Sequence, residues 1–161
     1  MSKVFLCIGT NLGNRESNLK EAVVMIREHI GRVLNYSSVY ETAPWGFDTE
    51  NNFLNMVIRV ETSQAPDELM KKIFMVESML GRIRKEERYS SRVIDIDILL
   101  YEDQVIAQNG LRIPHPLMHV RRFVLAPLCE IAPQTQHPVL KTTIQSLLDN
   151  CKDISNVKRY K

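Results

Sequence analysis

Apolar residues recur along the chain with the two spacings that are typical of strands and of helices. A continuous apolar run at 4–8 predicts a buried strand, and glycine and asparagine residues at 9–14 predict a turn after it. Apolar residues then fall three and four positions apart, which predicts a helix over 15–30 that ends at Gly31. The chain therefore opens with a strand, a turn and a helix.

Two further strands and a second helix follow. Segments 33–42 and 53–61 are rich in residues that favour strands, and the proline, glycine and asparagines between them predict a loop over 43–52. Pro66 suits the first turn of a helix whose apolar stripe continues as far as Gly81.

The remaining segments complete the order of elements. A polar loop over 82–92 leads into a strand over 93–101, and a final helix is predicted near 142–150. Segment 123–128 suits either a short strand or a helix, and the tail from about 151 has no assignment. The order β-α-β-β-α-β predicts an α+β fold with a ferredoxin-like core, in which helices pack on one face of a mostly antiparallel sheet.

Length and composition fit one globular domain that spans 1–161. The chain has 161 residues, of which 44% are hydrophobic and 25% are charged, and these fractions exclude a disordered or coiled-coil chain. A net charge of +2 does not indicate a nucleic-acid partner, and no apolar stretch approaches the roughly 20 residues of a membrane span. Three cysteines without a C-x-x-C pair favour a reduced, cytoplasmic protein, and we expect a monomer.

Two aspartates interrupt a strongly apolar strand. Asp95 and Asp97 alternate with Ile94, Ile96 and Ile98. The two carboxylates therefore share one strand face, with Cα atoms about 6.6 Å apart, and can bind one Mg²⁺ or bracket two. A solvated strand face, or charges that protect a sheet edge, would explain them without a metal. Because aspartate is disfavoured in strands, we favour the metal site.

A basic loop directly precedes this strand. Between Arg82 and Arg92 there are five cations and two carboxylates, and arginine binds phosphate oxygens through two parallel hydrogen bonds. A solvated basic loop would have the same composition. Its position beside the aspartates favours a polyphosphate substrate, whose charge metals and arginines would neutralise together.

Weaker signals suggest further contacts. His115 stands between two prolines and could donate to a phosphate or a ribose, although a lone histidine is more often structural. Phe53 and Asn55 share a strand face and could stack on and hydrogen-bond a flat heterocycle, although core packing also explains Phe53. Gly9 and Gly13 lack the Gly-Lys-Ser/Thr ending of a P-loop, so we prefer a strand-to-helix turn there.

Motifs in a fixed order cover nearly the whole chain. The most specific is the run over 81–101, Gly-Arg-x-Arg-x-x-x-Arg-Tyr-x-x-Arg-x-Ile-Asp-Ile-Asp-Ile-Leu-Leu-Tyr. The others lie at 8–14, 40–46, 53–55, 113–116 and 122–133. Together these motifs resemble those of the 6-hydroxymethyl-7,8-dihydropterin pyrophosphokinases of folate synthesis.

The resemblance implies transfer of pyrophosphate from ATP to the hydroxymethyl oxygen of the pterin, with release of AMP. It implies two Mg²⁺ ions as cofactors, both held by the aspartate pair. The catalytic residues that it implies are Arg82, Arg92, Asp95 and Asp97. The ATP contacts that it implies are Glu77, Arg84, Arg88, Tyr89, Ile98, His115 and Arg121. The pterin contacts that it implies are Thr42, Pro44, Trp45, Phe53, Asn55 and Phe123, with the ring between the two phenylalanines.

Two other classes of protein remain open. A ferredoxin-like sheet can bind single-stranded RNA through surface aromatics, but two aspartates on an exposed strand would repel phosphates without metals. A metal-dependent nucleotidyltransferase or nuclease would also suit an Asp-x-Asp strand. The product distinguishes the enzymes, because a pyrophosphokinase releases AMP and a nucleotidyltransferase releases inorganic pyrophosphate.

Overall fold

The computed structural model describes residues 1–43, 52–81 and 93–161. The strands are β1 (Ser2–Thr10), β2 (Gly31–Tyr36), β3 (Tyr40–Thr42), β4 (Phe53–Thr62), β5 (Asp95–Tyr101), β6 (Ile106–Gln108), β7 (Leu111–Ile113) and β8 (Val157–Arg159). The helices are α1 (Arg15–His29), α2 (Pro66–Met79), α3 (Arg122–Ile131) and α4 (Ile144–Asp149), with a 3₁₀ turn at Met118–Val120.

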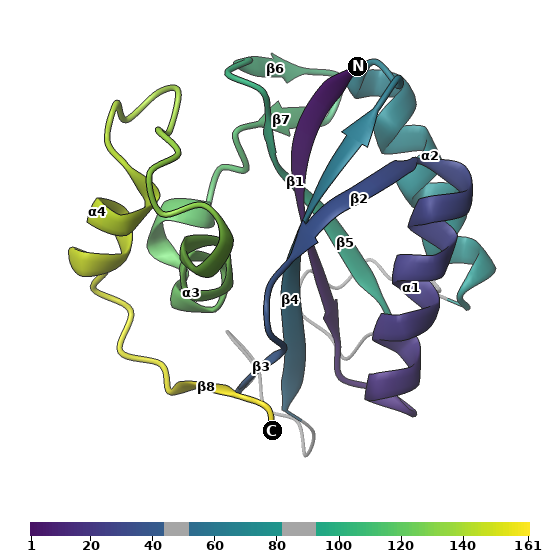
Figure 1. Ribbon diagram of the computed structural model, residues 1–161, viewed down its shortest axis with the longest axis horizontal. Helices are drawn as coiled ribbons and strands as arrows, with labels where there is room; N and C mark the ends of the chain where they lie inside the picture. The colour runs from purple at the N-terminus through teal and green to yellow at the C-terminus, as the bar shows by residue number, and fades with distance from the viewer. Residues whose placement is uncertain (44–51, 82–92) are drawn as a thin grey trace.

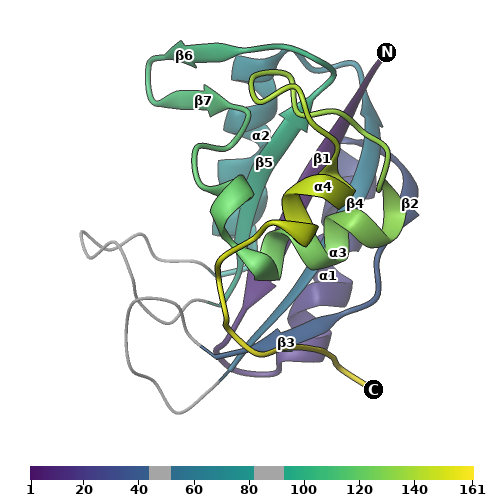
Figure 2. The same cartoon turned by 90° about the vertical axis from the view of Figure 1, so that its left-hand side faces the viewer.

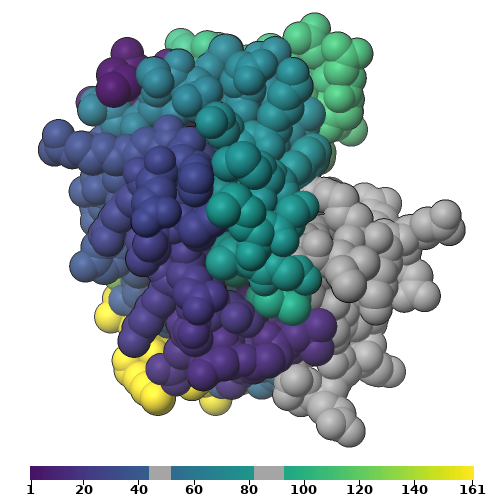
Figure 3. All heavy atoms as spheres, turned by 90° about the vertical axis from the view of Figure 1, so that its right-hand side faces the viewer, coloured from purple at the N-terminus to yellow at the C-terminus, as the bar shows by residue number. Residues whose placement is uncertain are grey.

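The centre of the molecule is an antiparallel sheet of six strands (Figure 1). Its order is β5-β1-β4-β3-β8. Strand β2 pairs with the second half of β4, whereas β3 pairs with the first residues of β4. Helices α1 and α2 cover one face, and α3 and α4 lie against the other (Figures 1 and 2). Figure 3 shows the first of these faces, where α1 and α2 lie side by side on the surface. This arrangement confirms the predicted α+β fold with a ferredoxin-like core and adds a second helical layer.

Strand β1 is buried on both faces, which explains its continuous apolar run. Val4, Leu6 and Ile8 belong to the core cluster beneath α1 and α2. Phe5 and Cys7 belong to a second cluster with α3 and α4. Two cores therefore share one central strand, and the strands on either side of β1 carry the residues of interest.

The turn before α1 has the chemistry that the sequence predicts. Gly13 has a φ of +69°, a left-handed conformation that favours glycine. The side chain of Asn14 accepts a hydrogen bond from the N–H of Ser17 at 3.1 Å and caps the helix. The predicted strand-to-helix turn is therefore confirmed at 11–14, whereas Gly9 and Thr10 still belong to β1 and pair with Asn55 and Leu54 of β4.

Several element boundaries differ from the prediction. The single strand expected over 33–42 is two strands, because Ser37 pairs with Val57 through its backbone N–H and its hydroxyl group rather than through a regular ladder. Gly31 does not stop α1 in a left-handed conformation but begins β2. A Cβ atom there would lie 2.2 Å from the carbonyl oxygen of Glu61, so only glycine fits this close approach.

The C-terminal third resolves what the pattern left open. Segment 123–128 lies within α3 and is helical. The predicted final helix is α4, and the hydroxyl group of Thr143 caps it by accepting from the N–H of Ser146. The unassigned tail includes β8, which pairs with β3. No helix in the described ranges is long and apolar enough to cross a membrane.

Candidate active site

The two aspartates of β5 lie on the face that α3 covers in part. Asp95 pairs in register with Gly9 of β1, and Asp97 pairs with Cys7. Both aspartates are half-buried, whereas Ile96 between them is buried in the core on the other face. The alternation predicted from the sequence is therefore confirmed, and both carboxylates point away from α1 and α2.

The pKa of the buried Cys7 thiol depends on the charged side chains on this face of the sheet. Burial, and then the charges of Asp97 and Asp95, raise the pKa of Cys7 well above its ordinary value, and Arg121 has an opposing effect. The aspartates, Cys7 and Arg121 thus lie within electrostatic range of one another. Among the described residues, this part of the site brings together two carboxylates and the guanidinium group of Arg121.

His115 is held in this region as a neutral hydrogen-bond donor. Its backbone N–H donates to the carbonyl oxygen of Leu99 at 3.0 Å, and its Nδ1 accepts from the N–H of Leu117 at 3.1 Å. Since Nδ1 is an acceptor, the ring proton is on Nε2. Burial, reinforced by Arg121 and opposed by Asp95, lowers the pKa of His115 to about 4. Near neutral pH this side chain can donate a hydrogen bond without carrying charge.

Arg121 links residues predicted for two different substrates. Its guanidinium carbon lies 5.6 Å from the centre of the Phe123 ring, within the range of a cation–π contact. Phe123 is partly buried at the start of α3. The predicted ATP contact and the predicted pterin contact are therefore neighbours.

A second group of predicted residues lies two strands away on the same face. Asn55 pairs with Gly9 from the opposite side of β1, so Asp95, Gly9 and Asn55 form a row across three strands. The Cα atoms at the ends of this row are about 10 Å apart, from a strand spacing of about 4.8 Å. Asn55 is 4% exposed and lies so close to Gly9 that a Cβ there would be 2.6 Å from its Oδ1 atom. Glycine at position 9 makes room for this amide.

Two buried polar atoms in this group have no hydrogen-bond partner among the described residues. They are the Nδ2 atom of Asn55 and the Oγ1 atom of Thr42. Thr42 pairs with Phe53, and Asn55 lies two residues further along β4. Buried polar groups are rarely left unsatisfied, so their placement indicates a site that receives a polar ligand.

Two other predicted ATP contacts, Glu77 and Ile98, make structural contacts within the fold. Glu77 is 2% exposed, and its Oε2 accepts from the N–H of Ile96 at 2.9 Å, so it supports the strand that carries the aspartates. The side chain of Ile98 packs in the core beneath α1 and α2. Contacts of these two residues with ATP stay predictions. The predicted site residues that lie outside the described ranges are Pro44, Trp45, Arg82, Arg84, Arg88, Tyr89 and Arg92.

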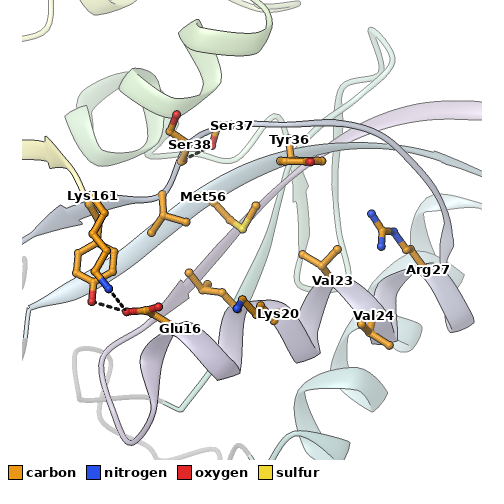
Figure 4. Close-up of a pocket in the computed structure, with 13 residues that line it drawn as sticks. Glu16, Lys20, Val23, Val24, Arg27, Tyr36, Ser37, Ser38, Met56 and Lys161 are labelled. Atoms are coloured by element: carbon orange, nitrogen blue, oxygen red, sulfur yellow. Dashed lines mark hydrogen bonds and ion pairs between the residues drawn. The ribbon is translucent and has the colours of Figure 1, made fainter.

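A cavity of about 590 Å³ lies on the opposite side, between α1 and the segment that joins β2 to β3 (Figure 4). Leu19, Val23 and Met56 contribute apolar surface, and Glu16 accepts hydrogen bonds from Tyr160 and Lys161 at one end. None of the described residues that line this cavity is a predicted site residue. The aspartate face therefore remains the candidate active site.

Comparison with known proteins identifies the family of this chain. Residues 5–133 match the family model for 7,8-dihydro-6-hydroxymethylpterin-pyrophosphokinase (HPPK). The chain belongs to the HPPK family. A relative from Aquifex aeolicus (strain VF5), named 2-amino-4-hydroxy-6-hydroxymethyldihydropteridine pyrophosphokinase, is 40% identical over 145 residues, which cover 90% of this chain and 89% of that protein. A Bacillus subtilis (strain 168) protein of the same name is 41% identical over 133 residues, covering 82% and 79%.

Solved structures with an HPPK domain share the fold. The crystal structure of Plasmodium falciparum HPPK-DHPS wild type with pteroate has a TM-score of 0.77 at 17% identity, and the match covers 92% of this chain. The same match covers 44% of that longer chain. At this level of identity the likeness supports the HPPK fold.

The sequence pattern did not identify the β1 residues that lie between the two groups of predicted site residues. Cys7 and Gly9 lie between the two groups of predicted residues only because β1 pairs with both β4 and β5. Their period of two places them on one strand face, but nothing local in the sequence identifies their partners. The same applies to Thr10 and Asn18, which contact the backbone just before β5.

Proposed function

We propose that this chain is a 6-hydroxymethyl-7,8-dihydropterin pyrophosphokinase that uses Mg²⁺-ATP. In this reaction the hydroxymethyl oxygen forms a bond to the β-phosphorus of ATP and loses its proton. The bond between that phosphorus and the bridging oxygen of the α-phosphate breaks, and AMP leaves with this oxygen. The observation that carries the proposal is the row of Asp95, Gly9 and Asn55 in a member of the HPPK family.

We assign the metal to Asp95 and Asp97. Carboxylate oxygens are the donors that Mg²⁺ prefers, and the two side chains share one half-buried face of β5. The described residues contain no group of three or more histidine, cysteine or acidic side chains that could enclose a metal. Phosphate oxygens and water would then complete the coordination, which suits two ions that arrive with ATP. When bound, Mg²⁺ neutralises charge on the polyphosphate.

We assign the pterin to the end of the site formed by β3, β4 and the start of α3. The buried amide of Asn55 and the hydroxyl group of Thr42 can hydrogen-bond the polar edge of the heterocycle. Phe53 and Phe123 supply flat apolar surfaces for its two sides. Pro44 and Trp45 belong to this proposal by their position in the motif after Thr42.

We assign the phosphates and ribose of ATP to the opposite end, beside the aspartates. His115 can donate from Nε2 to a phosphate or ribose oxygen without requiring protonation. Arg121 contributes a fixed positive charge beside the predicted pterin ring. The remaining ATP contacts in this proposal are Glu77, Arg84, Arg88, Tyr89 and Ile98.

Arg82 and Arg92 are proposed to act on the transferred group. Attack on a polyphosphate is slow because negative oxygens repel the incoming electron pair, and arginines offset this charge in the transition state. Their role is therefore expected in the rate of transfer more than in ATP affinity. We further propose a cytoplasmic monomer, consistent with three free cysteines, of which Cys7 is buried.

A product assay tests the proposed function. The protein is mixed with ATP, Mg²⁺ and 6-hydroxymethyl-7,8-dihydropterin, and the nucleotide and pterin products are separated by chromatography. Equal amounts of AMP and pyrophosphorylated pterin are expected. Release of inorganic pyrophosphate would instead support a nucleotidyltransferase. Salt-sensitive retention of labelled RNA without any Mg²⁺-dependent consumption of ATP would support an RNA-binding module.

A further inference from the structure

The backbone just before Asp95 is held by side chains rather than by the sheet. The ladder between β1 and β5 ends at the pair Gly9–Asp95. Beyond this pair, the carbonyl oxygen of Val93 accepts hydrogen bonds from the Oγ1 atom of Thr10 and from the Nδ2 atom of Asn18. We call Thr10, Asn18 and Val93 the Val93 cluster.

The members of the Val93 cluster hydrogen-bond one another, and Asn18 also contacts the backbone of Leu12. Asn18 Nδ2 lies 2.8 Å from the carbonyl oxygen of Leu12, 3.1 Å from Thr10 Oγ1 and 3.2 Å from the carbonyl oxygen of Val93. Because two of these neighbours are carbonyl oxygens, the amide nitrogen must face them. The Thr10 hydroxyl group then accepts from Asn18 and donates to Val93. Two donors therefore converge on one carbonyl group, two residues before Asp95.

The position of the cluster separates it from the reacting atoms. Thr10 is fully buried, and the alternation of β1 places its side chain on the opposite face from Gly9. Asp95 faces the same side as Gly9 because the two are paired. Thr10 and Asn18 therefore reach Asp95 through the backbone of 93–95 rather than by touching its carboxylate face.

We propose that Thr10 and Asn18 are positioning residues that fix the backbone of Asp95 for metal binding. This inference rests on the proposed role of Asp95 as a metal ligand. Removal of either donor weakens the hydrogen bonding that holds this part-buried carbonyl group, and a shift there displaces the strand that carries the carboxylate. Residues that orient metal ligands typically alter metal affinity or activity by about 10- to 100-fold when they are replaced.

Three variants separate hydrogen bonding from packing. Thr10→Val keeps the side-chain shape and removes the hydroxyl group, whereas Thr10→Ser keeps the hydroxyl group and removes a methyl group. Asn18→Leu removes both amide donors at a second, partly buried position. If Thr10→Val does not fold, Asn18→Leu and Thr10→Ser still decide the question.

Thr62→Val provides a matched control. Thr62 is 1% exposed, and its Oγ1 donates to the carbonyl oxygen of Ile30 at 2.7 Å, so it also holds a backbone carbonyl group from a buried position. It pairs with Ser2 at the far end of β1, seven residues from Gly9, which is about 23 Å along the strand. Its loss should reduce stability without changing the aspartate face.

The measurement is Mn²⁺ binding to the full chain in the presence of α,β-methylene-ATP, which cannot transfer pyrophosphate. Electron paramagnetic resonance counts free Mn²⁺, so the readout does not depend on turnover. We expect Thr10→Val and Asn18→Leu to raise the Mn²⁺ dissociation constant by roughly tenfold or more. Thr10→Ser and Thr62→Val should bind Mn²⁺ like the wild type. Their melting temperatures should fall only by the methyl packing or the hydrogen bond that each variant loses.

Either of two results would overturn the inference. Unchanged Mn²⁺ binding in Asn18→Leu and in any folded Thr10→Val protein would show that the cluster does not position Asp95. If Mn²⁺ binding weakens in all four variants in proportion to their loss of melting temperature, the cluster has only a general structural role. If the wild type forms AMP and the variants bind Mn²⁺ normally, only this inference fails. A wild type that neither binds Mn²⁺ with the analogue nor forms AMP refutes the proposed function as well.

Discussion

A methyl group added at Gly9 should weaken pterin binding while leaving the fold intact. The backbone of Gly9 is not left-handed, so alanine is compatible with its conformation. The new Cβ would lie 2.6 Å from Oδ1 and 3.7 Å from Cγ of Asn55. The clash is with the end of a side chain rather than with backbone. The amide should therefore rotate away while the strands stay paired.

The expected loss follows from what that amide is proposed to do. Asn55 is 4% exposed, and a displaced amide can no longer hydrogen-bond the buried edge of the heterocycle. Loss of such a group costs about 1–3 kcal/mol, which is roughly a 5- to 150-fold rise in the pterin dissociation constant. ATP affinity should change little, because the aspartate end of the row is on the other side of Gly9.

Titration calorimetry with the pterin, α,β-methylene-ATP and Mg²⁺ measures both affinities. Gly9→Ala, Asn55→Ala and the double variant form a cycle. Once the Asn55 side chain is removed, the methyl group meets no clash, so the double variant should match Asn55→Ala alone. Additive losses in the double variant would show that the methyl group does not act through Asn55. Equal losses of pterin and ATP affinity would show that the effect is not confined to the pterin end.

Three further predictions concern the proposed metal ligands, the two proposed catalytic arginines and His115. Asp95→Ala and Asp97→Ala should each abolish turnover with an unchanged circular dichroism spectrum, because both side chains are half-buried on a polar face; full activity in either variant would eliminate the two-carboxylate role. Arg82→Ala and Arg92→Ala should lower the single-turnover rate far more than ATP affinity, and Lys85→Ala should not; equal, salt-dependent defects in all three would contradict the assignment. The pKa of His115 is about 4 in the folded protein and 6.5 in the unfolded chain. As the pH falls below 6.5, the unfolded chain therefore binds a proton that the folded protein does not, and the free energy of unfolding decreases. This loss should be about 2 kcal/mol between pH 7 and pH 5, and urea unfolding of His115→Gln should lack that part of the slope.

The sequence predicts the parts of the site that depend on local periodicity. The alternation of Asp95 and Asp97 with isoleucines is enough to place both carboxylates on one face of β5, and the structure agrees. The pairing of Asn55 and Asp95 with the two sides of Gly9 is a long-range property, because strand register depends on contacts between distant segments. A single sequence does not contain this row as a local pattern.

Glycine shows how one residue type can have different physical roles. Gly13 follows the turn chemistry expected of it, with a positive φ. Gly31 is needed instead because the backbone of Glu61 approaches it closely, and Gly9 is needed because Asn55 lies over it. Periodicity predicts that a helix ends near Gly31, but it does not reveal which atoms from other strands occupy the missing side chain's place.

The C-terminal tail could not be assigned because its contacts are distant in sequence. Tyr160 donates from its backbone N–H to the carbonyl oxygen of Val39 at 2.8 Å, and its hydroxyl group donates to Glu16 at 2.7 Å. A three-residue strand has almost no periodicity of its own, so β8 is specified by β3 rather than by its local sequence.

A single-turnover experiment with ATP labelled at the β-phosphorus tests whether this site transfers an intact pyrophosphoryl group to the pterin. Enzyme in excess of ATP is mixed with Mg²⁺ and the dihydropterin, and the label is followed through the products. All of the label is expected to move to the pterin, AMP should be unlabelled, and Asp97→Ala should leave the label in ATP. Label in ADP, in free pyrophosphate or in AMP would contradict transfer of an intact pyrophosphoryl group by this site.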